Sequence, residues 1–315
     1  MTVAITGATG VVGGAVLRHL LADGQHVRAL MRSSRALPPE VEPVNGDVFD
    51  PESLQRCFAG VETVYHLAGV NQLCSRRPET MLRVNVEGTR LVTQAASEAR
   101  LVHTSSAAAL GEAEGEIGDE TTRPRSNWNS EYARTKWMGE QAVLSVSNRQ
   151  EVVVVNPSSV QGPGRASGTG KLLLGVMSGR LRTLVETRIS IVDIDDCARG
   201  HLLAARKGVN GERYVLNSFS MSLSEAVGII EGVVGHELGV RYLPPLVARL
   251  IGAIGGGVFR VLGQDAPICS ESVRTVLHGH VYDGSRATRE LGLVYTPADL
   301  TLRRLFDWAR QEGKV

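Results

Sequence analysis

The sequence predicts a doubly wound α/β fold, in which helices cover both faces of a parallel sheet, followed by a smaller and mainly helical C-terminal domain. Short apolar runs alternate with helix-length amphipathic segments through the first two-thirds of the chain. This alternation is typical of parallel strands buried on both faces. A glycine-rich turn follows the first apolar run, and the pattern changes near residue 160, where a Gly- and Ser-rich stretch begins.

The apolar runs give seven candidate strands, beginning with the run that precedes the glycine turn. These strands span residues 3–5, 26–31, 41–46, 63–68, 101–106, 152–156 and 213–217. The clearest helical patterns between them span residues 13–24, 51–60 and 84–99. Because the strands are expected to be parallel, a ligand site should lie at their carboxyl ends.

The change of pattern indicates two domains. Residues 1–160 form the expected sheet domain, residues 190–217 return to it, and residues 161–315 mainly form the second domain. The stretch "SSVQGPGRASGTGKLLLG" reads as the loop that leaves the sheet. Near the C-terminus the most apolar segment, residues 243–263, is interrupted by Arg249 and Arg260 and is too short to span a bilayer. It predicts a buried helix in preference to an interfacial one.

Composition excludes several classes of protein. Lys and Arg number 34 against 33 Asp and Glu, so there is no basic field to hold a nucleic acid. The four cysteines are far apart, which suggests free thiols in a reducing compartment. The eight histidines form no metal-binding spacing either, so we expect no metal. The N-terminus lacks the features of a secretory signal, and a cytoplasmic location follows as an expectation.

The glycine turn "TGATGVVGG" is the first functional motif. Thr6, Gly7, Gly10 and Gly13 lie between a strand and an amphipathic helix. Glycines allow a tight turn and let backbone N–H groups approach a pyrophosphate at the helix N-terminus. Such a turn is often only structural, but this position between a strand and a helix favours a dinucleotide site.

The end of the second strand indicates which dinucleotide is bound. An acidic residue normally stands there to bind the adenosine ribose of NAD. Here Met31 stands in that place, Arg32 follows it, and Ser33, Ser34 and Arg35 come next. An arginine suits a ribose 2′-phosphate, so we expect NADP(H), with NAD(H) as the alternative. A solvent-facing arginine at a strand end is the simpler interpretation.

Tyr132 and Lys136 are one helical turn apart in "NSEYARTKWMGE". A phenol is a poor base at neutral pH, but a nearby ammonium lowers its pKa and makes it a usable acid or base. Thr104 to Ser106 close the fifth candidate strand, where a hydroxyl can donate a hydrogen bond to a substrate oxygen. The alternative is a purely structural role, in which a surface Tyr packs on the aliphatic part of the Lys side chain. The serines lack a Gly-x-Ser-x-Gly elbow, so a hydrolase is unsupported.

At this point the chain strongly resembles the extended short-chain dehydrogenase/reductase superfamily of epimerases and dehydratases, along nearly its whole length. The resemblance is carried by "TGATGVVG", "NGDVFDP", "VYHLAG", "NVEGT", "VHTSSAAALG", "YARTK", "VVVNPSSVQGPG" and "DIDDCARGHLLA". It implies a Rossmann sheet domain and a catalytic trio of Ser106, Tyr132 and Lys136. Tyr132 would exchange the proton, Lys136 would also hold the nicotinamide ribose, and Ser106 would orient the substrate oxygen.

The resemblance also implies a set of residues along the cofactor. Asp47 and Val48 would flank the adenine, and Asn85 would sit near the inner ribose. Pro157 and Ser158 would lie at the nicotinamide end. The full expected set is Thr6, Gly7, Thr9, Gly10, Val11, Val12, Gly13, Arg32, Asp47, Val48, Leu67, Ala68, Gly69, Asn85, Thr104, Tyr132, Lys136, Pro157 and Ser158.

Departures from the family pattern narrow the expected activity. Ala108 stands where sugar-nucleotide epimerases often have Thr, and Asp193 replaces the His of "HVDD". The second strand and the C-terminal apolar segment look like the dihydroflavonol reductase, hydroxysteroid dehydrogenase and hopanoid-associated epimerase-like branch. We therefore expect an enzyme that interconverts a carbonyl and an alcohol on a small, fairly apolar molecule. The alternatives are a nucleotide-sugar 4-epimerase or dehydratase that retains NAD, and a cofactor-binding sensor without catalysis. The family also implies a homodimer.

Overall fold

The computed structural model describes residues 1–32, 37–125, 128–262, 264, 266 and 268–315. Its main feature is a seven-stranded, all-parallel sheet with the order β11-β7-β5-β4-β1-β2-β3. This order reverses between β1 and β4, which is where doubly wound sheets bind ligands. The expected fold class is confirmed. The strands are β1 (Thr2–Thr6), β2 (His26–Met31), β3 (Val41–Asn45), β4 (Thr63–His66), β5 (Arg100–Thr104), β7 (Val152–Pro157) and β11 (Arg213–Leu216).

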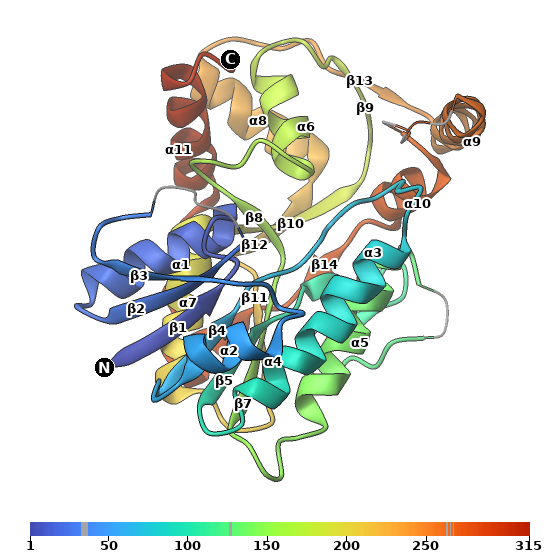
Figure 1. The fold of residues 1–315 in the computed structure, drawn as a ribbon. Helices are drawn as coiled ribbons and strands as arrows, with labels where there is room; N and C mark the ends of the chain where they lie inside the picture. Colours follow the sequence, from blue (N-terminus) through green and yellow to red (C-terminus); the bar gives the residue numbers. More distant parts are fainter. Residues whose placement is uncertain (33–36, 126–127, 263, 265, 267) are drawn as a thin grey trace.

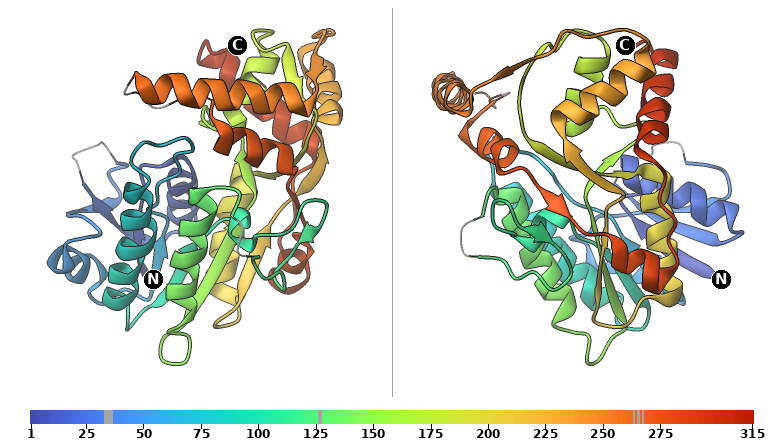
Figure 2. Two further views of the ribbon diagram at one scale, coloured as in Figure 1. Left: turned by 90° about the vertical axis from the view of Figure 1, so that its right-hand side faces the viewer. Right: turned by 180° about the vertical axis from the view of Figure 1, so that it is seen from behind.

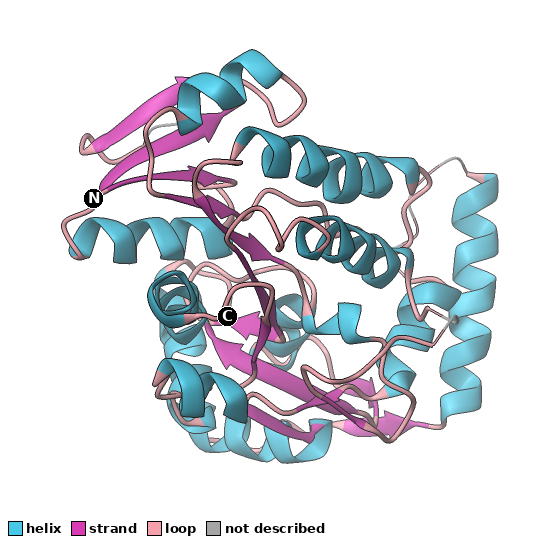
Figure 3. Cartoon of the chain, turned by 90° about the horizontal axis from the view of Figure 1, so that it is seen from below, coloured by secondary structure: helices cyan, strands magenta, loops and turns pink. Residues whose placement is uncertain are grey.

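Alternating side chains bury both faces of this sheet. Val3 and Ile5 point into one apolar core, while Ala4 points into the other, as strand geometry requires. Figures 1 and 3 show the helices on the two sides of the strands. One face is covered by α1 (Val11–Ala22) and α7 (Ile194–Lys207). The other face is covered by α2 (Pro51–Phe58), α4 (Thr89–Ala95) and α5 (Glu131–Leu144).

The C-terminal part has an apolar core of its own, above the sheet in Figure 1. Leucines and valines of three helices pack together there and against Ile191. The helices are α6 (Thr169–Met177), α8 (Leu223–Val234) and α11 (Ala298–Gln311). The small sheets contain β8 (Ser159–Gln161), β10 (Arg188–Asp193) and β12 (Phe219–Ser222); β9 (Thr183–Val185) and β13 (Arg241–Leu243); β6 (Ile117–Gly118) and β14 (Val281–Tyr282).

The helix expected over residues 84–99 is interrupted. The structure has a short α3 (Glu79–Leu82), a π-helix (Arg83–Gly88) and then α4. The Asn85 side chain hydrogen-bonds to the backbone of Val70, and Gly139 of α5 packs so closely that a Cβ there would lie 2.3 Å from the Asn85 carbonyl oxygen. Single π turns within helices are frequent at functional sites.

The apolar segment at residues 243–263 is not a buried helix, contrary to the expectation. It contains α9 (Pro245–Val261), which lies at the periphery of the molecule beside α10 (Ser270–His278) (Figure 2). Gly252 packs against Val273 of α10, but Leu246 and Ile254 are 68% and 67% exposed. Glycines such as Gly252 lie against α10, whereas the large side chains of Leu246, Leu250, Ile251 and Ile254 are exposed. No helix in the described ranges is long and apolar enough to cross a membrane.

The expectation of four free thiols is also wrong. Cys74 and Cys269 form a disulfide across 195 residues of sequence, whereas Cys57 and Cys197 are free and buried. The disulfide joins the loop after β4 to the start of α10. Because disulfides persist in oxidising environments, the cysteines no longer support a reducing compartment.

Candidate active site

The glycine turn brings backbone from three segments together. Gly7 has a φ of +77° and lies so close to the loop after β4 that a Cβ would be 2.7 Å from the Ala68 nitrogen. At Gly13 a Cβ would be 2.1 Å from the Gly7 carbonyl oxygen. Larger residues cannot occupy these positions without moving the backbone. Gly10 is the N-cap of α1, and no described side chain caps this helix end.

A buried polar network holds the turn in register with the neighbouring elements. The Thr6 hydroxyl lies 2.7 Å from His66 Nδ1, and His66 Nε2 lies 3.1 Å from the Thr89 hydroxyl. The Thr89 hydroxyl donates to the Asn85 carbonyl, and Asn85 Nδ2 donates to the Thr135 hydroxyl on α5. The network therefore links the glycine turn, the π-helix and the helix that carries Tyr132 and Lys136.

The expected trio comes together at the carboxyl end of β5. Ser130 caps α5, accepting a hydrogen bond from the Ala133 amide, so Tyr132 lies in the first turn of that helix. The Ser106 hydroxyl lies beside the Tyr132 side chain and acts to lower the pKa of its phenol. One turn further, the buried Lys136 Nζ donates a 2.6 Å hydrogen bond to the Thr104 carbonyl.

The charges around the trio differ from the expectation that the Lys136 ammonium lowers the pKa of Tyr132. Burial raises the pKa of Tyr132, and both the neighbouring Ser106 hydroxyl and the charge of Arg165 oppose this shift. The pKa of Lys136 is lowered to about 8, mainly by burial, with Glu140 acting in the other direction. The cation that stabilises a Tyr132 phenolate in this structure is Arg165 rather than Lys136. At neutral pH the phenol holds its proton.

Arg165 is a site residue that the sequence reasoning missed. It lies on the loop between β8 and α6, next to Gly164, whose position borders Val11 of the glycine-turn helix. The Arg165 Nε is buried and has no hydrogen-bond partner among the described residues. A guanidinium in this setting suits a phosphate or a substrate oxygen. Its position after "GPG" in the loop that leaves the sheet was the available signal.

The end of β2 separates Met31 from Arg32. Met31 is buried in the core, whereas Arg32 is exposed. Ser33, Ser34 and Arg35 lie outside the described residues. On the adjacent loop, the Asp47 carboxylate accepts a hydrogen bond from the Phe49 amide and Val48 is buried.

The other expected cofactor residues lie at the carboxyl ends of the strands or on the glycine turn. The Thr104 hydroxyl is 2.9 Å from His201 Nε2, and Ser158 donates its amide to the Leu216 carbonyl. The Ser158 hydroxyl is buried without a partner in the described ranges. Residues at the ends of β4 and β7 and at the start of α1 complete the set: Thr9, Val11, Val12, Leu67, Ala68, Gly69 and Pro157.

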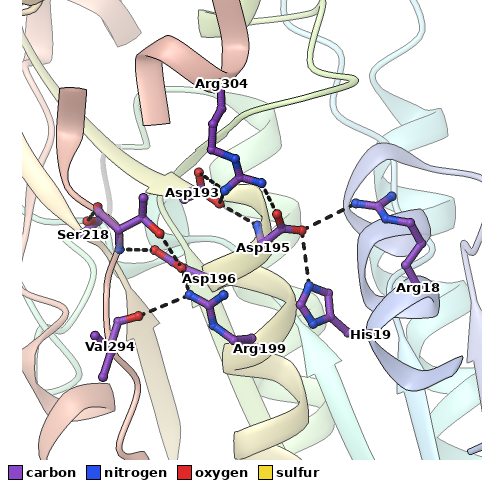
Figure 4. A network of polar contacts seen from close by, with 10 residues as sticks. Arg18, His19, Asp193, Asp195, Asp196, Arg199, Ser218, Val294 and Arg304 are labelled. Carbon is purple, nitrogen blue, oxygen red and sulfur yellow. Dashed lines mark hydrogen bonds and ion pairs between the residues drawn. The ribbon is translucent and has the colours of Figure 1, made fainter. Parts of the chain in front are cut away.

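Asp193, in the place of the family's His, caps the N-terminus of α7 and forms an ion pair with Arg304. Its carboxylate caps the Asp195 amide and accepts two 3.0 Å hydrogen bonds from Arg304 of α11 (Figure 4). Arg304 also contacts Asp195, which lies 3.2 Å from His19 of α1. The departure from the family pattern is therefore matched by an arginine from the C-terminal part.

These features fit a nicotinamide dinucleotide. The α1 N-terminus offers backbone N–H groups beside glycines that leave room for a pyrophosphate. Three polar groups could pair with a bound cofactor or substrate: the Lys136 ammonium, the Ser158 hydroxyl and the Arg165 Nε, of which the last two have no hydrogen-bond partner in the part of the chain that the structure describes.

Comparison with known proteins also indicates a family that binds a nicotinamide dinucleotide. A model of the NAD dependent epimerase/dehydratase family matches residues 3–216. A curated relative, sterol demethylase protein B of Methylococcus capsulatus, is 32% identical and covers 100% of both chains. Another relative, the 4-hydroxy-2-methyl-3-oxo-4-farnesyl-3,4-dihydroquinoline-1-oxide ketoreductase of Stigmatella aurantiaca, is 28% identical over 98% of this chain and 96% of its own length.

Solved structures agree. The crystal structure of gox2253 has a TM-score of 0.85 and 31% identity, covering 100% of this chain and 99% of its own. Structures of nucleotide-sugar epimerases are less than 25% identical and show the fold alone. The matched family model, the relatives and the sheet order establish that this chain belongs to the NAD-dependent epimerase/dehydratase family and is an NAD(P)-dependent oxidoreductase of the extended short-chain dehydrogenase/reductase type.

Proposed function

We propose that the protein interconverts a carbonyl and an alcohol on a small, fairly apolar molecule, using NADP(H) and the side chains of Ser106, Tyr132 and Lys136. The observation that carries the proposal is that the Tyr132 phenol lies beside the Ser106 hydroxyl, one helical turn from the buried Lys136, whose Nζ is fixed 2.6 Å from the Thr104 carbonyl. Two relatives whose names contain a sterol and a farnesylated quinoline support an apolar substrate.

The chain's own residues would act on the carbonyl oxygen. Burial keeps the Tyr132 phenol protonated at neutral pH, so it can donate that proton to the oxygen during reduction. The Ser106 hydroxyl would orient the same oxygen. The Arg165 guanidinium stabilises the phenolate that remains until solvent returns a proton. A bound nicotinamide would supply hydride to the carbonyl carbon, and Lys136 would hold its ribose.

Nucleotide-sugar epimerisation or dehydration with retained NAD is the second candidate. The partly buried Arg165 near Tyr132 favours it, because a guanidinium can bind a diphosphate. The two functions differ in how they treat the cofactor. We expect the purified protein to exchange NADP(H) freely and to consume it stoichiometrically with a carbonyl substrate. Tightly retained NAD, together with turnover of a nucleotide-sugar without net cofactor oxidation, would favour the second candidate.

Arg32 should determine the cofactor preference. Met31 cannot accept hydrogen bonds from ribose hydroxyls, whereas the exposed Arg32 guanidinium can pair with a 2′-phosphate. A charged hydrogen bond contributes about 1.5–3 kcal/mol, or roughly 10- to 100-fold in affinity. Arg32→Ala should remove most of the preference for NADP(H) over NAD(H), as measured by titrating each cofactor into the apo protein. Arg56→Ala, an exposed arginine on α2, is the matched control.

An equal affinity of the wild type for both cofactors would show that Arg32 only faces solvent.

Substrate selection is proposed to lie in residues 161–315 outside the returning stretch 190–217, since the core formed by α6, α8 and α11 is separate from the two cores of the sheet. A homodimer formed through helices of the sheet domain remains a prediction from the resemblance, and a cytoplasmic location remains an expectation from the sequence.

A further inference from the structure

Three side chains with metal-binding atoms lie close together in space, although one of them is distant in sequence from the other two. Glu112 follows the 3₁₀ helix Ala107–Leu110, His278 ends α10, and His280 precedes β14. One ligand atom from each lies within 4.8 Å of the other two. Glu112 Oε1 is 2.6 Å from His280 Nδ1 and 3.6 Å from His278 Nε2. Glu112 and His280 are 168 residues apart, so their proximity could not be read from sequence spacing.

The backbone around this cluster fixes the three side chains. Gly279 has a φ of +67°, a left-handed turn that separates the two histidines and lets both approach one carboxylate. Directly after His280, β14 pairs with β6, placing Val281 opposite Ile117. The cluster therefore joins the end of α10 to the loop that follows Ser106 and its 3₁₀ helix.

Burial argues for a ligand at this place. The Glu112 side chain is only 2% exposed, and the histidine side chains are 10% and 22% exposed. Among the described residues, Glu112 Oε2 has no hydrogen-bond partner. A buried carboxylate oxygen without a partner is costly, and a cation bound to the carboxylate would provide one.

We propose that Glu112, His278 and His280 bind one divalent transition-metal ion of the zinc type. Two imidazole nitrogens and a carboxylate are a ligand set that zinc favours, whereas calcium and magnesium prefer oxygen alone. Each histidine would bind the ion through the lone pair of a deprotonated ring nitrogen. A proton held on that nitrogen would move to the other ring nitrogen of a neutral imidazole, or to solvent from an imidazolium. Three protein ligands leave a fourth position for water or another polar group.

The alternative is that the carboxylate only accepts hydrogen bonds from the two histidines. Both accounts explain the distances, and the Tyr282 hydroxyl, 3.0 Å from His280 Nδ1, adds a polar neighbour in either case. The metal site in addition supplies a partner for the second carboxylate oxygen. They also predict different responses to zinc. An ion would fasten α10 to the sheet domain and raise the unfolding temperature, whereas a hydrogen-bonded cluster would not respond.

The test is calorimetric titration of the EDTA-treated, dialysed full-length protein with Zn²⁺ alone. We expect one ion bound per chain, weakened by at least about 10-fold in Glu112→Gln and in His280→Gln. Substitution of His236, an exposed histidine between α8 and β13, by Asn should leave the titration unchanged. Zinc should raise the unfolding temperature of the wild type and of the His236 variant but not that of the Glu112 variant.

A second readout protects the test against a variant that fails to fold. Co²⁺ added to the wild-type protein should give the visible absorption of a nitrogen- and oxygen-ligated site, and an equivalent of Zn²⁺ should abolish it. His278→Gln, at the end of α10, serves if a first variant is unfolded by circular dichroism. Absence of zinc uptake by the wild type, or uptake unchanged in the folded Glu112 and histidine variants, would overturn the proposal.

Discussion

Tyr132→Phe should lower turnover by about 10²–10⁴-fold, the usual loss for a missing general acid, while cofactor binding and the fold are kept. The substitution removes only the phenolic hydroxyl, whose pKa burial raises and the neighbouring Ser106 hydroxyl and the charge of Arg165 act to lower. The ring itself remains to fill the first turn of α5. Steady-state rates on a carbonyl substrate, with cofactor titration alongside, measure the effect.

Tyr214→Phe is the matched control. Tyr214 is a buried tyrosine of β11 whose hydroxyl contacts Glu290 and the Val209 amide rather than the trio. We expect this variant to lose some stability but little activity. Wild-type turnover by the Tyr132 variant would mean that another group delivers the proton. A wild-type protein that binds cofactor but turns over no carbonyl would instead favour a sensor, despite the intact trio.

The parallel sheet was predictable because its strands are buried on both faces. Val152 to Val155 point alternately into the two cores, so each position must be apolar and the run is continuous in the sequence. The glycine turn was predictable for a related reason. At Gly7 and Gly13 neighbouring backbone leaves no room for a Cβ, and only glycine fits.

What the sequence did not reveal depends on contacts between distant residues or on which face of an element is covered. The Cys74–Cys269 disulfide and the Glu112–His280 contact each join residues more than a hundred positions apart. The apolar pattern of α9 is the same whether its large residues meet a core or solvent. Arg165 was missed because the "GPG" before it marks the loop that leaves the sheet but does not indicate that Tyr132 lies beside it.

As the pH is lowered, this protein should lose stability at an unusually high pH, because three histidines are buried close to one another. Burial is the main cause that lowers the pKa of His66 to about 3 and that of His201 to about 4, and it also lowers the pKa of His103 well below the usual value. The His66 and His103 rings are 5.3 Å apart, and the charge of Lys136 acts on both. All three are therefore neutral in the folded protein at neutral pH.

The direction of the effect follows from proton uptake. Below about pH 6.5 the unfolded chain protonates these histidines, but the folded protein does not until the pH approaches their lowered pKa values. The stabilising effect of neutral histidines is thus present above pH 6.5 and lost as the pH falls towards 4. Each histidine contributes a slope of up to about 1.4 kcal/mol per pH unit, so three give about 4 kcal/mol per unit.

The free energy of unfolding of a domain is commonly only about 5–15 kcal/mol. A loss of about 4 kcal/mol per pH unit should therefore remove much of it between pH 6.5 and 5. Urea unfolding at several pH values measures the slope. His103→Leu should reduce it by about a third, because both nitrogens of His103 lack hydrogen-bond partners in the described structure and an apolar side chain leaves none unsatisfied. His236→Asn, on the surface, should leave the slope unchanged. A free energy of unfolding that stays constant from pH 7 to 5 would show that the buried histidines take up protons in the folded protein as readily as in the unfolded chain.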